Sequence, residues 1–107
     1  MNTFAEFQNL ANQVPLSLRN NLDRISLPAT GLQEAAGSIG SLLTRASASG
    51  HFRLPPEERS QLHDRLSESL WYMALLCEET GITLQEVAAH GIAQLQERVK
   101  QLDPDQR

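Results

Sequence analysis

The sequence has a single cysteine, Cys77, and only three histidines. One thiol cannot form a disulfide within the chain, and Cys77 lies inside an apolar run, so we expect a reduced, cytoplasmic setting. Structural zinc sites use four closely arranged Cys or His ligands. The composition therefore argues against a disulfide scaffold and against a structural zinc site.

Long apolar runs and an excess of positive charge are also missing. No run approaches the roughly 20 apolar residues that span a bilayer, and residues 1–6 lack the basic flank and apolar stretch of a secretory signal. The formal net charge is −4 and the pI is about 5.2, which argues against binding to a nucleic acid polymer or an anionic membrane. A nucleotide is compatible with this charge, because a metal ion or a local basic cluster can hold a phosphate.

Apolar residues recur at helical spacing through most of the 107-residue chain, and no segment has a convincing strand pattern. We therefore predict one all-α domain over residues 1–107, a bundle of four to five helices. Its core covers residues 27–102, its first helix covers residues 3–13, and residues 103–107 form a polar tail. Residues 16–25 also have helical spacing, but Asn20-Asn21 weakens that pattern.

The second main helix is predicted over residues 28–47, with Ser26 as its N-cap and Pro28 in its first turn. Three glycines, each of which lowers helix propensity by roughly 1 kcal/mol, fall inside it: Gly31, Gly37 and Gly40. They indicate either close backbone packing against a neighbouring helix or a loosely formed helix.

Two further helices follow an irregular connection over residues 46–54. The third begins with a pair of prolines at positions 55 and 56, and we expect it to continue to Thr80 and to end at a left-handed Gly81. Thr83 and Glu86 form a capping box for the fourth helix. The apolar side of that helix consists of Leu84, Val87, Ala88, Gly91, Ile92, Leu95, Val99 and Leu102.

Residues 70–77 of the third helix are apolar on every side. A helix that is apolar all round is normally buried all round, and three other helices of this size can hardly cover it. We therefore predict a homodimer or homotetramer in which copies of the chain bury this segment together.

Carboxylates on the second and third helices have the spacing to share one site. Glu34 and Arg45 lie on one face of the second helix, with two serines between them, and Asp64 and Glu68 align on the third. If these faces meet, two or three carboxylates converge, and Mg²⁺ prefers such oxygen ligands together with water and substrate phosphates. The alternative is that Asp64, Arg65 and Glu68 form a solvated helix face.

Residues 31–39 read Gly-Leu-Gln-Glu-Ala-Ala-Gly-Ser-Ile, and residues 66–72 read Leu-Ser-Glu-Ser-Leu-Trp-Tyr. In this order and spacing they resemble the MazG-type all-α nucleoside triphosphate pyrophosphohydrolases, and residues 80–88 are similar to that family's short turn and last helix. The resemblance covers about residues 27–98. It implies a MazG-like bundle that uses Mg²⁺ to hydrolyse a nucleoside triphosphate to the monophosphate and pyrophosphate.

The resemblance also places some of the family's acidic ligands on this chain. Glu34 falls on the first glutamate of the motif and Glu68 on an aspartate, while Asp64 lies one position from a further glutamate. The implied metal site is therefore Glu34, Glu68 and Asp64, with Mg²⁺ as the cofactor if the site functions, and no catalytic residue is assigned. Three positions where the family has glutamate carry other residues: Ala35, Ser38 and Arg65.

Three arginines, Arg45, Arg65 and Arg53, suggest a different chemistry, because guanidinium groups bind phosphate oxygens directly. The alternative is that each is an ordinary surface arginine. Three functions therefore stay open. The chain is a divergent Mg²⁺-dependent pyrophosphohydrolase, a non-catalytic protein that binds a nucleotide, or a helical scaffold for protein interaction.

Overall fold

The computed structural model describes residues 3–14, 20–48 and 50–102. Within these ranges the chain forms four α-helices and no strand, which confirms the predicted all-α class. The helices are α1 (Phe4–Gln13), α2 (Asp23–Ala46), α3 (Pro56–Thr80) and α4 (Leu84–Lys100). The predicted polar tail and residues 16–19 of the ambiguous segment lie outside the described residues, and residues 23–25 of that segment belong to α2.

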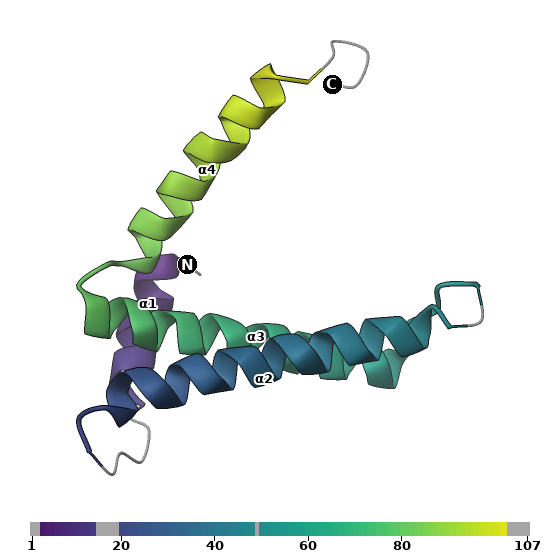
Figure 1. The fold of residues 1–107 in the computed structure, drawn as a ribbon, viewed down its shortest axis with the longest axis horizontal. Helices are drawn as coiled ribbons and strands as arrows, with labels where there is room; N and C mark the ends of the chain where they lie inside the picture. The colour runs from purple at the N-terminus through teal and green to yellow at the C-terminus, as the bar shows by residue number, and fades with distance from the viewer. Residues whose placement is uncertain (1–2, 15–19, 49, 103–107) are drawn as a thin grey trace.

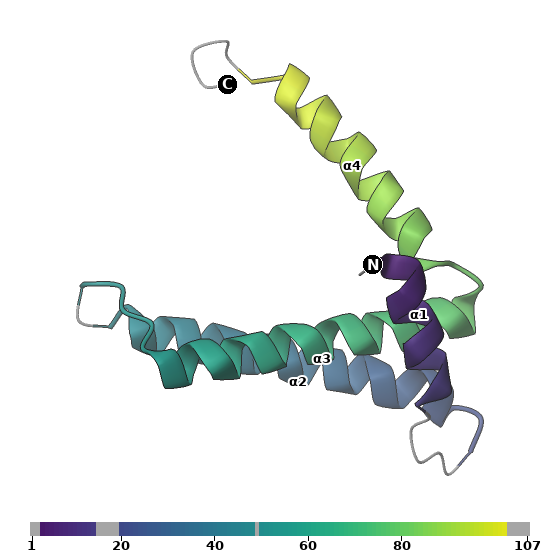
Figure 2. The same ribbon diagram turned by 180° about the vertical axis from the view of Figure 1, so that it is seen from behind.

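The two long helices, α2 and α3, form an antiparallel hairpin (Figure 1). Helix α1 crosses the end of the hairpin at which α3 finishes, and α4 points away from the pair (Figures 1 and 2). At the same end the Arg24 Nη1 atom lies 3.5 Å from Glu79 Oε1. At the other end the Arg53 amide donates to the Ala46 carbonyl at 3.2 Å, which closes the connection between the two helices.

The predicted start of the second helix at Pro28 is wrong, because α2 begins five residues earlier, at Asp23. The N-cap position is Leu22, which makes no side-chain capping bond, and Ser26 lies within the helix. The Asn20 side chain accepts a hydrogen bond from the Asp23 amide at 3.2 Å. Pro28 therefore lies inside the helix, where it is fully buried. Pro28 has no N–H to donate to the Arg24 carbonyl, so the helix loses one backbone hydrogen bond at this position.

The caps of α3 and α4 agree with the sequence pattern. Gly81 ends α3 in the left-handed region with φ 74°, and the Ile82 amide donates to the Cys77 carbonyl at 3.1 Å. Thr83 Oγ1 accepts from the Glu86 amide at 3.0 Å and caps α4. Only a short turn therefore separates α3 from α4.

The largest group of buried apolar side chains lies where α1, α3 and α4 meet. It contains Ala11, Ala74, Cys77 and Leu84, and the partly buried Phe7, Leu70 and Trp71 pack against it. Polar contacts also join α1 to α3: Gln8 Nε2 donates to the Ala74 carbonyl at 2.9 Å, and Asn12 Nδ2 donates to Glu78 Oε2 at 3.1 Å. Burial raises the pKa of the Cys77 thiol, and the negative charge of Glu86 raises it further, so the thiol is protonated at neutral pH.

The apolar segment of α3 over residues 70–77 is partly covered within the chain. Ala74 and Cys77 are buried, and most of the other side chains of the segment are half-buried, but Met73 is exposed. Oligomerisation through this segment stays a prediction. Of the described helices, none combines the length and the hydropathy that a bilayer-spanning helix requires.

Candidate functional site

An open groove of about 950 Å³ lies between α2 and α3, on the half of the hairpin nearer the connection. Helix α2 contributes one carboxylate, two hydroxyls and one guanidinium, because residues 34, 38, 41 and 45 repeat at helical spacing along one face. Helix α3 contributes Gln61 and Arg65, which are four residues apart. The lining residues are Glu34, Gly37, Ser38, Ser41, Leu42, Arg45, Gln61 and Arg65.

A second cavity of about 400 Å³ adjoins the groove toward the connection between the helices. The two share Leu42, Arg45 and Gln61. Arg53 and Glu58 line only the second cavity. The three arginines singled out from the sequence therefore lie along one continuous surface, which we call the arginine groove: the residues that line these two cavities.

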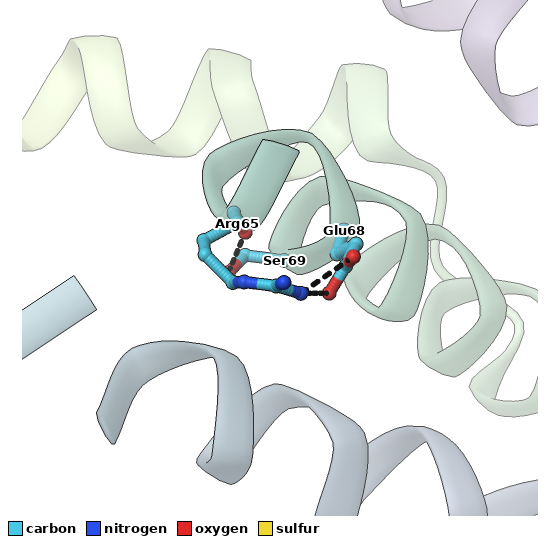
Figure 3. A network of polar contacts seen from close by, with 3 residues as sticks. All are labelled: Arg65, Glu68 and Ser69. Carbon is cyan, nitrogen blue, oxygen red and sulfur yellow. Dashed lines mark hydrogen bonds and ion pairs between the residues drawn. The ribbon is translucent and has the colours of Figure 1, made fainter. Parts of the chain in front are cut away.

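Arg65 is held by its neighbour one turn later on α3. Its Nη1 atom lies 2.7 Å from both carboxylate oxygens of Glu68, and its carbonyl accepts from Ser69 Oγ at 2.9 Å. Figure 3 shows the guanidinium and the carboxylate on the side of α3 that faces α2. The charge-assisted contact orients the guanidinium, and the Nη2 and Nε donors of Arg65 are not used by Glu68.

The implied Mg²⁺ site does not fit this arrangement. A cation at Glu68 has to displace the Arg65 guanidinium, which already occupies both carboxylate oxygens. Glu34 lines the groove, but Asp64 lines neither cavity. The part of the chain that the structure describes has no group of three or more Asp, Glu, His or Cys side chains arranged to hold a metal ion, whereas Mg²⁺ demands near-ideal octahedral oxygen geometry.

Arg45 and Arg53 leave their charges available to an external anion. Both side chains are exposed, and neither forms an ion pair with another described residue. The acids that line the arginine groove are Glu34 and Glu58. Together with Glu68, which contacts Arg65, three carboxylates balance the three guanidinium groups, so the groove is less acidic than the chain as a whole, whose net charge is −4.

Two polar residues that line the groove, Gln61 and Glu58, are not identified from the sequence pattern. Gln61 lines both cavities, and Glu58 lines the one near the connection. Gln61 and Glu58 lie four and seven residues before Arg65, which places all three on one face of α3. Helical spacing counted from Arg65 therefore identifies both residues.

Comparison of the chain with models of protein families, with curated proteins and with solved structures found no match.

Proposed function

We propose that the chain is a MazG-like helical protein that binds the phosphate chain of a nucleotide in the arginine groove and does not hydrolyse it. The Arg65–Glu68 contact supports this proposal most directly, because a guanidinium lies against Glu68 where the family resemblance implies a metal cation. The nucleotide is suggested by the resemblance of residues 31–39 and 66–72 to nucleoside triphosphate pyrophosphohydrolases.

The chemistry of the groove suits a phosphate chain. A guanidinium presents N–H donors in a planar fork that matches phosphate oxygens. Arg65 keeps its Nη2 and Nε donors while Glu68 holds its Nη1, so little side-chain freedom is lost when an anion binds. Arg45 is shared by the two cavities and lies between Arg53 and Arg65 along the groove, and the three groups offer successive contacts to neighbouring phosphates.

The same residues explain why binding does not lead to hydrolysis. In metal-dependent hydrolysis the ion activates the attacking water as well as neutralising the phosphates. Arginine supplies only the second effect, because its pKa lies too far above 7 for it to accept a proton. Glu68, the acid nearest to Arg65, is engaged by that guanidinium. Two other carboxylates, Glu34 and Glu58, line the groove, but the described residues offer no cluster of acids that would hold a water-activating metal ion.

Titration with ATP by calorimetry tests the proposal. We expect binding both in EDTA and in Mg²⁺, because guanidinium groups rather than a metal hold the phosphates, and we expect the affinity to fall as salt rises. The double substitution Arg45→Gln, Arg65→Gln should weaken binding at least about tenfold, since hydrogen bonds to charged groups contribute about 1.5–3 kcal/mol each. Arg24→Gln is the matched control, because Arg24 lies at the opposite end of the hairpin.

Two outcomes contradict the proposal in different ways. Mg²⁺-dependent release of pyrophosphate, above the level of a Glu34→Ala, Glu68→Ala variant, would identify the chain as an active pyrophosphohydrolase. No binding at millimolar nucleotide, in EDTA or in Mg²⁺, would favour a helical scaffold for protein interaction instead.

A further inference from the structure

One side of α4 is apolar and uncovered within the chain. Past Leu84, one set of apolar residues follows the alternating four- and three-residue spacing of a helix-packing seam. Its last member, Leu102, lies two residues beyond the helix end at Lys100. The four large ones are between 42% and 61% exposed, although α4 is a regular helix. We call this set the α4 seam: Ala88, Ile92, Leu95, Val99 and Leu102.

We propose that the α4 seam forms the interface between two copies of this chain. The chain exposes 8240 Å² of surface, whereas a folded monomer of 11.9 kDa typically exposes about 5,950 Å². A stable interface needs about 800 Å² from each partner. The excess over a typical monomer is larger than that area, so the chain as a whole exposes enough surface for a stable dimer.

The dimensions of the chain agree with the surface area. The Cα radius of gyration is 17.1 Å, against about 13 Å for a typical domain of this length. Figures 1 and 2 show the cause, because α4 points away from the α2–α3 hairpin and contacts the remainder of the chain only near its start. A second copy packed along α4 covers the surface that this arrangement leaves exposed.

The residue types of the α4 seam favour another helix of the same kind as the partner. β-branched residues, Ile92 and Val99, alternate with leucines, Leu95 and Leu102, and this alternation favours pairing of two helices. The ion pair between Glu97 and Lys100, 3.8 Å apart, lies off the seam by its helical position. A two-fold pair therefore brings apolar surfaces together without burying these charges, and it needs no partner other than the chain itself.

Sedimentation equilibrium measures the mass directly. We expect the full chain to have twice its 11.9 kDa mass at roughly 0.1 mM, a concentration at which a dimer with a micromolar dissociation constant is almost fully formed. Leu95→Glu places a charge in the middle of the α4 seam and should raise the dimer dissociation constant at least about tenfold, because a buried unpaired charge is strongly unfavourable. Ala93→Glu introduces the same charge on an exposed, off-seam position and should leave the constant unchanged.

Circular dichroism of each variant shows whether the helices are kept. If Leu95→Glu does not fold, Val99→Ser tests the same surface with a smaller change at an exposed position near the helix end. A wild-type monomer at 0.1 mM, or a dimer that folded Leu95→Glu or Val99→Ser does not weaken, would overturn the proposal. The result is separate from nucleotide binding, because the α4 seam shares no residue with the arginine groove.

Discussion

Replacing Leu84 with alanine should lower the free energy of unfolding by about 2–5 kcal/mol, the usual range for a buried leucine. Leu84 is 4% exposed and packs with Ala11, Ala74 and Cys77. It is the buried residue of α4, so its side chain attaches that helix to α1 and α3. Truncation leaves a cavity at this junction. The loss is a large part of the 5–15 kcal/mol that stabilises a typical domain.

Urea unfolding followed by circular dichroism measures the effect of Leu84→Ala. Leu22→Ala is the matched control, since Leu22 is 76% exposed, and it should change the free energy of unfolding by no more than about 0.5 kcal/mol. All variants must be compared at one protein concentration, because association adds to the apparent stability. Equal effects for the two leucines would contradict the described core.

Replacing Gly31 with alanine should destabilise the chain by about 1–3 kcal/mol, the range for overpacking a core. A Cβ atom at position 31 would lie 2.5 Å from Tyr72 Cζ, so the ring has to move. The Tyr72 ring is in turn packed against Trp71, with 5.2 Å between the ring centroids. The gain in helix propensity of roughly 1 kcal/mol from replacing glycine offsets only part of this cost.

Gly37→Ala is the matched control for Gly31→Ala, because nothing lies within 4 Å of a Cβ atom at position 37. That substitution should stabilise the chain by about 0.5–1 kcal/mol. Urea unfolding gives both values, and combining Gly31→Ala with Tyr72→Leu should recover part of the loss if the ring is its cause. A stabilised Gly31→Ala variant would show that the ring moves at no cost.

The sequence predicts the helices and most of their ends correctly because these depend on neighbouring residues. Gly81 and Thr83 act through contacts within a few positions of the chain, and both lie where the pattern indicates. The start of α2 is missed because two local rules compete. Pro28 favours a first helical turn, but the helix begins five residues earlier, where the Asn20 side chain accepts from the Asp23 amide. Of the three glycines in α2, only Gly31 lies so close to another side chain that a Cβ atom would contact it. Sequence spacing does not distinguish Gly31 from the other two.

The candidate site is predictable only in outline. Helical spacing identifies the faces that carry Glu34, Arg45 and Arg65, and the structure brings these residues to one groove. Spacing does not show that Arg65 donates hydrogen bonds to both carboxylate oxygens of Glu68, because that contact depends on side-chain rotamers. Membership in the MazG-like family and the activity that it implies stay predictions.

The buried cluster lies at one end of the hairpin, so the local stability of α2 and α3 should decrease from that end toward the connection between them. Helices α1, α3 and α4 pack together where Ala74 and Cys77 are buried. Near the connection, α2 and α3 pack only against each other (Figure 1). Segments with few buried contacts open at lower free energy than the core. Backbone amides around Arg45 and Arg53 should therefore exchange with solvent earlier than those around Ala74, and a phosphate ligand bound there would slow the exchange of the least protected part of the hairpin.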